Sequence, residues 1–372
     1  MKFHIVKRDN CPFWKKCCFY LGAVVIALLM GAALLTALGV DPVAYYTRMF
    51  TMGNIGNKIA YKTFENCLKE FVPLTLTSVA LSLAFKMRFW NIGGEGQFIM
   101  GAIAAGTVAL KLGPVLPNAA VLLMMCASAM IAAGLYGLFI AVLKVKYGTN
   151  ETLMTLMLNY VALYLLVFFG ETKAEWNFFL DPKSVRPVFA SFSKLASFPK
   201  IPLVGKFGLN VCVIFTFIIG LLVYIYIKYT KHGYEITVVG DSAGTAHYAG
   251  MNVNAVVLRT VLLSASLIGL AAAFKVGTAG ILSTSITNDV GWTGIIVAWL
   301  SKLNTAAIFV VSSLITVLHF GSTIAAATFS QVDSSFANML QGVILFLVLA
   351  ADFYTRFKVV VVHKGGNGNG NG

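Results

Sequence analysis

The amino-acid sequence predicts an all-α, polytopic membrane protein with about ten transmembrane helices. Of its 372 residues, 58% are hydrophobic and only 11% are charged. The chain repeatedly runs for about eighteen or more residues with almost no charge, and a helix needs about 20 apolar residues to cross a bilayer. Most Lys and Arg residues flank these apolar runs. This combination is typical of a membrane protein and not of a soluble globule.

Ten spans are expected, approximately at residues 17–39, 71–87, 97–112, 118–143, 151–169, 208–228, 255–275, 288–301, 304–328 and 337–355. Basic residues lie before the first span, after the fourth and after the last: Lys2, Lys7, Arg8, Lys15, Lys16, Lys144, Lys146, Arg356, Lys358 and Lys364. Because positive charge stays on the cytoplasmic side, both termini are expected in the cytoplasm. An even number of crossings agrees with that orientation.

The remaining segments divide the chain further. We expect a cytoplasmic N-terminal segment at 1–16, a transmembrane domain at 17–358 and a low-complexity tail at 359–372. External segment 41–70 contains DPVAYYTRMF and NKIAYKTFENCLKEF, which are typical of short interfacial helices. External segment 170–207 carries four prolines and is predicted to be irregular. Residues 229–254 form the longest cytoplasmic loop.

Several function classes are poorly supported. The net charge of +14 is spread along the ends of spans and forms no basic stripe, so no nucleic-acid partner is expected. The chain has no GxxxxGK[ST] phosphate loop. Its six cysteines have no metal-type spacing and its five histidines are dispersed, so no metal, cofactor or catalytic residue is predicted.

One polar stretch, NIGGEGQ at 91–97, separates two apolar runs. Three glycines allow the helix to break there, and freed backbone amides are then expected to point inward as ligands. Non-helical backbone at membrane depth is tolerated only inside protein or beside a water-filled cavity, and the Glu95 carboxylate is costly there unless paired. The alternative is a simple turn near the cytoplasmic surface, after Lys86 and Arg88.

A similar interruption, GTAGILSTSITNDVGWTG, occurs in the second half. The preceding pieces LAFKM (83–87) and AAFKV (272–276) are alike and cross in opposite directions, which indicates an inverted repeat with a site at broken helices. The aromatic rings of Trp90 and Trp292 are suited to stack on a planar substrate, or to anchor the chain at the interface. The candidate substrate path comprises Trp90, Asn91, Glu95, Gln97, Asn288, Asp289, Trp292 and Thr293.

Three stretches resemble a known family: FKMRFWNIGGEGQFIMGAIAA, GTNETLMTLMLNY and GYEITVVGDSAGTAHYAGMNV. They are similar to motifs of ABC importer permeases of the branched-chain amino acid and simple-sugar superfamily, in particular its nucleoside (basic membrane protein-associated) branch. The stretches follow one another in order over about 160 residues, and the apolar pattern extends the resemblance to nearly the whole chain. Two departures are VVGDSAGTA, where an Arg or an Asn-Pro pair is common, and Trp292, where Phe is common.

The resemblance implies a type II-like importer fold with two inverted repeats. It implies as partners a second permease subunit, identical or homologous, two cytoplasmic ABC ATPases that use ATP and Mg, and an external substrate-binding lipoprotein. It also implies that a short helix near residues 244–250 docks into the ATPase, and AGTAHYAGM carries less charge than a solvated loop usually does. The candidate coupling residues are Asp241, Gly244, Thr245, His247, Tyr248 and Gly250.

The expected function is therefore ATP-driven nucleoside import across a bacterial cytoplasmic (inner) membrane by alternating access. Nucleosides are favoured because the candidate path combines planar aromatic rings with amide and acid groups suited to a base edge. A permease for a simple sugar such as ribose or galactose is the close alternative. An ATP-independent channel or secondary carrier is a further alternative, and an intramembrane enzyme would require clustered titratable residues that the sequence does not show.

Overall fold

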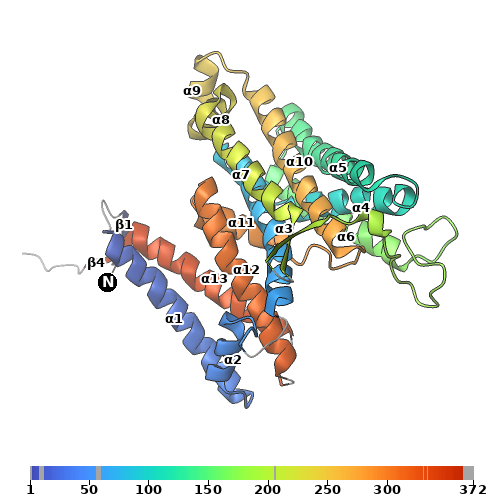
Figure 1. Ribbon diagram of the computed structural model, residues 1–372. Coiled ribbons are helices and arrows are strands. Elements are labelled where there is room, and N and C mark those ends of the chain that lie inside the picture. The colour runs from blue at the N-terminus through green and yellow to red at the C-terminus, as the bar shows by residue number, and fades with distance from the viewer. Residues whose placement is uncertain are drawn as a thin grey trace, which may run out of the picture. The chain divides into compact units, whose positions relative to one another are not determined.

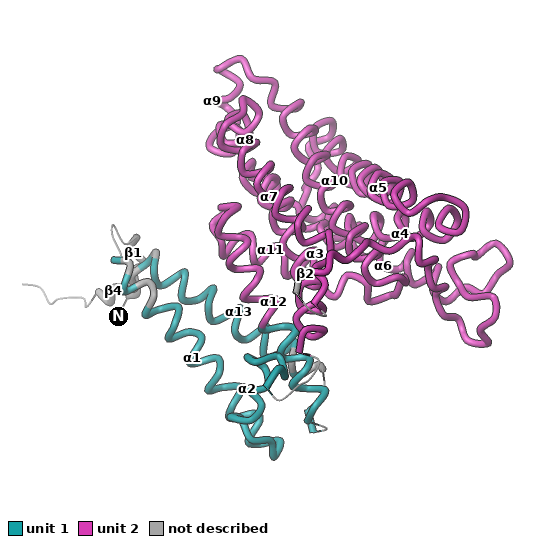
Figure 2. Tube along the Cα trace, in the orientation of Figure 1, with its two compact units in different colours: residues 1–55, 318–372 teal, residues 56–317 magenta. Residues whose placement is uncertain are grey.

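The structure is a computed structural model that describes residues 2–7, 12–55, 60–204, 207–329, 331–332 and 334–362 (Figure 1). Arg8, Lys364 and most of the predicted tail lie outside the described residues. The chain divides into two units, residues 1–55 with 318–372 and residues 56–317 (Figure 2). We call them unit 1 and unit 2.

Unit 2 contains most of the helices. They are α3 (Ala60–Lys86), α4 (Gly94–Leu112), α5 (Asn118–Tyr147), α6 (Glu151–Glu171), α7 (Val211–Tyr229), α8 (Lys231–Asp241), α9 (Ala243–Tyr248), α10 (Val253–Ala279), α11 (Val290–Leu300) and the first part of α12 (Thr305–Thr328). The segment between α6 and α7 holds the 3-10 turn η1 (Lys194–Ala196) and an antiparallel hairpin of β2 (Lys200–Val204) and β3 (Phe207–Asn210).

Unit 1 contains α1 (Phe13–Ala37), α2 (Pro42–Phe50), the end of α12 and α13 (Ser334–Arg356). Strands β1 (Lys2–Lys7) and β4 (Phe357–Val362) pair antiparallel beside these helices. Tyr45 of α2 is fully buried, and the centroid of its ring lies 5.9 Å from that of Phe329 and 5.8 Å from that of Phe336. This aromatic core holds α2 against the long helices.

Each of the ten predicted spans coincides with a helix, and the multi-pass architecture is confirmed. Among the described residues, eight helices are long and apolar enough to cross a membrane. The two predicted spans that do not qualify are α4 and α11. Helix α11 has 11 residues, so it rises only about 16 Å, which is too short to cross a bilayer by itself.

The prediction for the first external segment is half right. Helix α2 occupies DPVAYYTRMF, and Asp41 caps it by accepting a hydrogen bond from the Val43 amide at 3.0 Å. The second predicted interfacial helix is wrong, because its described part is the beginning of α3, which continues without interruption to Lys86. No glycine lies within α3 to end the helix, and Pro73 sits inside it.

Helices α4, α5 and α10 pack with their backbones in contact. A Cβ atom placed on Gly101 of α4 would lie 2.8 Å from the Cα of Gly269 in α10, and one placed on Gly269 would collide with the carbonyl of Ala129 in α5. Small residues at such crossings allow close approach, which replaces the hydrophobic driving force that lipid cannot supply. These three helices form the rigid frame of the site described below.

Candidate functional site

The chain between α3 and α4, residues 87–93, is the first break. Arg88 has a left-handed backbone (φ 57°), and α4 starts at Gly94. The predicted break at 91–97 is therefore displaced, since Glu95 and Gln97 lie in the first turn of α4. The glycines serve close packing: a Cβ on Gly96 would lie 2.9 Å from the Asn159 Oδ1 atom.

Helix α6 satisfies the backbone of the first break. Asn159 accepts a hydrogen bond from the Gly96 amide at 2.8 Å and donates one to the Ile92 carbonyl at 2.9 Å. The Ile92 amide donates to the Thr155 hydroxyl at 3.2 Å. The prediction that these amides serve as ligands is wrong, because they are paired within the protein.

Asn91 and Gln97 form a buried pair of amides. Each donates to the other, at 3.1 and 3.2 Å, and Asn91 also accepts from the Gly93 amide at 3.1 Å. Both side chains are fully buried. A buried polar group is stable only when it is hydrogen-bonded, and this pair meets that condition while holding the turn into α4.

The second break, residues 280–289, lies between α10 and α11 and consists of turns over residues 284–289. The Phe192 amide donates to the Gly280 carbonyl at 2.9 Å, which ties the start of this break to the segment between α6 and α7. Asn288 and Asp289 both have left-handed backbones, with φ of 47° and 56°. Asn and Asp adopt this conformation more readily than other non-glycine residues, so the sequence here suits the sharp turn into α11.

The two breaks meet at Glu95. Its Oε2 atom accepts a hydrogen bond from the Gly291 amide at 2.8 Å, and Thr287 and Trp292 line the same pocket. The residue is 9% exposed. A carboxylate near free amides at a helix N-terminus is stabilised by the helix dipole. Glu95 thus caps α11 from a position 196 residues earlier in the chain.

A pocket of about 260 Å³ opens beside Glu95. It is lined by side chains from α4, α6, the second break and α11: Glu95, Asn159, Tyr160, Leu163, Thr284, Ser285, Thr287, Asn288, Asp289 and Trp292. These groups are hydroxyls, amides, carboxylates and aromatic rings, and none of the lining residues is a Lys, Arg or His. The pocket can therefore bind hydroxyl and N–H donors and a planar face, and it offers no cation to an anionic ligand.

Four of the eight predicted path residues line this pocket: Glu95, Asn288, Asp289 and Trp292. Trp90 lies elsewhere and stacks on Trp299, with ring centroids 5.2 Å apart and planes inclined by 18°. Asn91 and Gln97 form the buried pair, and the Thr293 amide continues α11 by donating to the Asp289 carbonyl.

Five polar or aromatic lining residues were missed: Asn159, Tyr160, Thr284, Ser285 and Thr287. Asn159 could have been found from the sequence, because it is an amide within the otherwise apolar run of α6. It ends the stretch GTNETLMTLMLNY together with Tyr160. The three hydroxyl residues lie in the second predicted interruption, but a series of turns has no regular periodicity that identifies which of them face a cavity.

The predicted coupling segment forms α8 and α9, where the sequence indicated a polar loop with a short helix. The Ser242 hydroxyl accepts a hydrogen bond from the Thr245 amide and caps α9. All six candidate coupling residues are exposed, and Tyr248 is 95% exposed. Ala246 is buried and faces the protein. This short helix therefore presents one polar and aromatic face outward.

In α8, Glu235 accepts a hydrogen bond from Arg259 of α10 at 2.8 Å. This hydrogen bond lowers the pKa of Glu235, and it outweighs burial, which raises the pKa. His232 also contacts the carboxyl group at 3.4 Å. The carboxylate is therefore held in its charged form and links α8 to α10.

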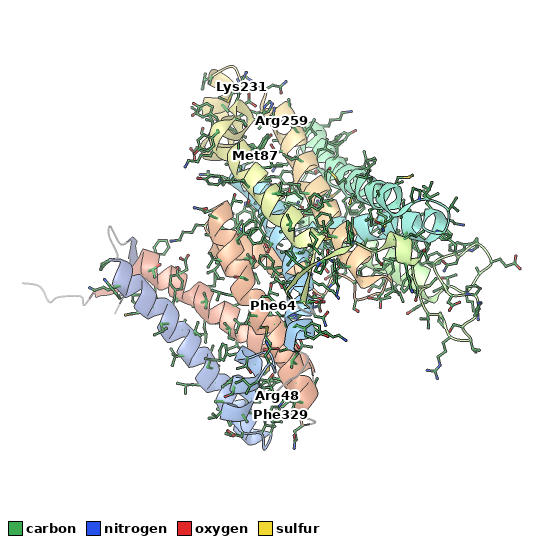
Figure 3. All side chains as sticks on the ribbon, in the orientation of Figure 1. Arg48, Phe64, Met87, Lys231, Arg259 and Phe329 are labelled. Carbon is green, nitrogen blue, oxygen red and sulfur yellow. The ribbon has the colours of Figure 1, made fainter. Side chains whose placement is uncertain are left out.

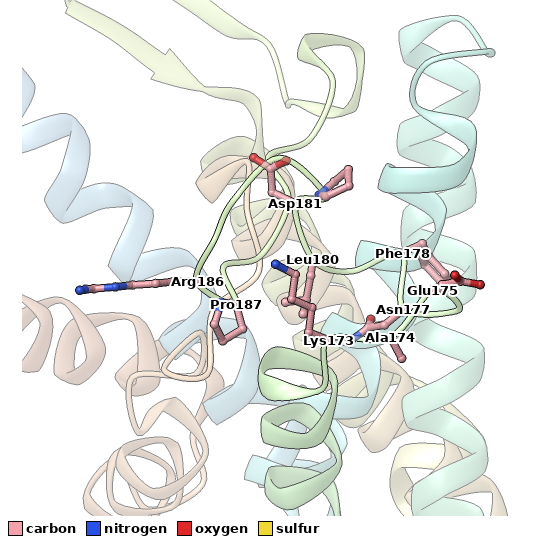
Figure 4. A pocket seen from close by; sticks show the side chains of 10 residues that line it. Lys173, Ala174, Glu175, Asn177, Phe178, Leu180, Asp181, Arg186 and Pro187 are labelled. Atoms are coloured by element: carbon pink, nitrogen blue, oxygen red, sulfur yellow. The ribbon is translucent and has the colours of Figure 1, made fainter.

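A second, larger pocket of about 620 Å³ lies in the segment that follows α6 (Figure 4). Its walls include charged side chains of both signs, among them Lys173, Glu175, Asp181 and Arg186. The Lys173 ammonium donates to the Ser184 carbonyl at 3.0 Å and so closes part of the loop. This surface has a mixed charge, unlike the pocket at Glu95.

The fold and the broken helices define a membrane permease, and the comparisons with known proteins agree. Residues 63–349 match the family described as branched-chain amino acid transport system, permease component. The chain belongs to this family and is the permease subunit of an ABC transporter. Such a subunit is not itself an enzyme, and a separate ATPase partner hydrolyses ATP.

Curated relatives cover nearly the whole chain. A glucose ABC transporter permease of Haloferax volcanii is 27% identical over 95% of this chain and 92% of its own length. A nucleoside ABC transporter permease of Lactococcus lactis is 26% identical over 81% of this chain and 82% of its own. A guanosine ABC transporter permease of Bacillus subtilis is 26% identical over 92% of this chain and 96% of its own.

Asn159 should be important for stability. Replacing it with Ala leaves the Gly96 amide and the Ile92 carbonyl without partners, and each unpaired buried group costs about 1–3 kcal/mol. We expect Asn159→Ala to lower the thermal unfolding midpoint of the purified protein in detergent. The matched control is Asn66→Ala, because Asn66 is exposed and, among the described residues, accepts a hydrogen bond from the Lys69 ammonium alone. Equal midpoints for the two variants would contradict the bracing role of Asn159.

Proposed function

We propose that this permease carries nucleosides into a bacterial cell through the pocket at Glu95. The observation that carries the proposal is the meeting of the two breaks at one pocket lined by carboxylates, amides, hydroxyls and aromatic rings. Irregular backbone at membrane depth is found where it lines a cavity, and transporters place their sites at such broken helices.

The chemistry of the pocket suits a nucleoside. Carboxylates and amide oxygens accept hydrogen bonds from ribose hydroxyls and from the N–H groups of a base edge. Trp292, 38% exposed, and Tyr160, 51% exposed, offer rings on which a base can stack. Because Glu95 and Asp289 are acidic and no cation lines the pocket, a phosphorylated nucleoside meets repulsion there.

The relatives support the same direction. Two of them are named for nucleoside and guanosine transport and match most of this chain. A second candidate function is import of a simple sugar, which the glucose relative favours, since a sugar presents the same hydroxyl donors to the pocket. Nucleosides remain our choice because two aromatic residues line the pocket beside the acceptors.

The proposed importer has more chains than this one. Ser285, Asn288 and Asp289 are exposed polar residues beside the pocket, and lipid cannot face them without a large cost, so we place a second permease subunit over them. An external substrate-binding lipoprotein delivers the nucleoside to the segment between α6 and α7. ATP and Mg bind the partner ATPase, and both termini of this chain lie in the cytoplasm.

In this mechanism, the exposed residues of α9 dock into the ATPase. Binding of ATP closes the ATPases, α8 and α9 transmit the movement, and the pocket opens alternately to the two sides of the membrane. This chain supplies the substrate path and the helices that transmit the movement, and the free energy for transport comes from ATP at the partner ATPase.

Uptake of labelled guanosine, uridine, ribose and glucose, with and without this chain, tests the proposal. We expect loss of nucleoside uptake when the chain is absent and unchanged uptake of both sugars. Loss of sugar uptake alone would contradict a nucleoside substrate and favour import of a simple sugar. Nucleoside uptake that persists without the ATPase, and stops when ion gradients are dissipated, would favour a secondary carrier.

Glu95 should be required for uptake. Glu95→Ala leaves the Gly291 amide unpaired, and a buried donor without a partner costs about 1–3 kcal/mol, so uptake should fall by about tenfold or more. Glu95→Gln keeps a carbonyl that can accept this hydrogen bond, and it should retain more uptake than Glu95→Ala. The measurement is the initial rate of guanosine uptake at matched membrane expression. Equal rates of guanosine uptake for wild type and Glu95→Ala would show that Glu95 is not required at the site.

Trp292 should distinguish nucleosides from sugars. Stacking of a base on an aromatic ring is worth about 1–3 kcal/mol, so Trp292→Leu should lower guanosine uptake by about tenfold. Trp292→Phe keeps an aromatic face and serves as the matched control, with a much smaller loss expected. Identical rates for the Leu and Phe variants would show that no base stacks at this position.

A further inference from the structure

Helix α8 contacts both of the long helices that end at the two breaks. Helix α3 leads into the first break, and α10 leads into the second. Figure 3 shows Lys231 of α8, Met87 and Arg259 at one end of unit 2, away from Phe64 at the start of α3. A movement of the coupling segment can therefore be passed to both breaks, through α3 and through α10.

The contact between α8 and α3 is made by backbone atoms. Gly240 of α8 packs so tightly on the end of α3 that a Cβ atom there would collide with the Lys86 carbonyl and lie 3.3 Å from the Cα of Met87. Met87 is the first residue of the first break. A backbone contact cannot relax by a change of rotamer, so a shift of Gly240 displaces the chain that leads to Glu95.

Apolar packing surrounds this contact. One buried cluster joins Ile236 and Val239 of α8 and Ala246 of α9 to Met87 and Phe89 of the first break. The same cluster includes residues of α3, α5 and α10. A densely packed core has low compressibility and transmits strain. This packing therefore keeps the contact between Gly240 and the end of α3 rigid.

The contact between α8 and α10 is an ion pair. Arg259 donates to the Glu235 carboxylate at 2.8 Å, with side chains 35% and 14% exposed. Arg259 lies near the start of α10, whose far end opens into the second break and then Gly291. Glu95 accepts a hydrogen bond from the Gly291 amide, so the chain that follows α3 and the chain that follows α10 meet at the pocket.

We infer that α8 is a two-armed lever that moves both breaks together, through Gly240 against Lys86 and through Glu235 against Arg259. Gly240, Glu235 and Arg259 are positioning residues that act on the pocket through the breaks. This inference rests on the proposed docking of α8 and α9 with the ATPase, but it requires no particular substrate. Loss of either arm should uncouple the pocket from the ATPase while leaving the ATPase bound and active.

The experiment follows the pocket directly. Thr284→Cys, in a background where the six native cysteines are replaced by Ala, places a thiol at the pocket. The rate of labelling by a maleimide is compared between the nucleotide-free and the vanadate-trapped importer. In the parent we expect this rate to differ between the two states by about fivefold or more. An equal rate in both states of the parent would overturn the inference.

Variants then test each arm. Glu235→Arg and Arg259→Glu should each abolish the difference in labelling and lower guanosine transported per ATP hydrolysed by about fivefold. The double exchange restores opposite charges and should recover both quantities, which a general loss of stability would not do. Singles that keep the difference, or a double exchange that fails to recover it, would overturn the role of this arm.

Gly240→Ala tests the other arm against Gly342→Ala, where an added Cβ meets no atom within 4 Å. Gly240→Ala should abolish the difference in labelling rate between the nucleotide-free and the vanadate-trapped states, and Gly342→Ala should keep it. If Gly240→Ala does not reach the membrane, the charge exchange decides the inference. Copurification of the ATPase is measured throughout, because loss of the ATPase from the parent would refute the proposed docking, whereas lost coupling with the ATPase still bound is the result that the lever predicts.

Discussion

The hydrogen bond from the Gly291 amide to the Glu95 carboxylate is the interaction on which the site depends. It joins two breaks that are far apart in the sequence, and it satisfies the N-terminus of a helix too short to cross the membrane alone. Without it, the buried Gly291 amide at the start of α11 would lack a partner, and an unpaired buried donor costs about 1–3 kcal/mol. This hydrogen bond therefore fixes the start of α11 to α4, beside the broader packing of α10 on α4 and α5.

Close packing makes that hydrogen bond possible. A Cβ atom on Gly291 would collide with the backbone and side chain of Glu95, and a Cβ atom on Gly94 would lie 3.3 Å from Leu81. The frame of α4, α5 and α10 meets the same requirement further along, where Gly101 approaches Gly269. Glycine at these positions serves close approach and not turning, since α4 is helical from Gly94 onward. The same residues that looked like helix breakers are packing surfaces.

Much of the architecture could be predicted from the sequence, because hydrophobic runs and charge at their ends are local signals. The ten helices and the two interruptions follow from such runs. The candidate site was only half predicted. Glu95 and Trp292 were found because polar or aromatic residues in an apolar stretch stand out, whereas Trp90 was misplaced because its partner Trp299 is a tertiary contact. Asn159 was missed because its role depends on α6 meeting the first break, which no single segment encodes.

The placement of Glu95 also limits what it can do for a substrate. One oxygen already accepts a hydrogen bond from the Gly291 amide, and the residue is only 9% exposed. A buried carboxylate that already holds the start of α11 has little surface left for a ligand, so Glu95 shapes the pocket more than it binds cargo. Asp289 and Asn288 are exposed, line the same pocket and have left-handed backbones. Specificity for the cargo should therefore reside in the second break, while Glu95 keeps that break in place.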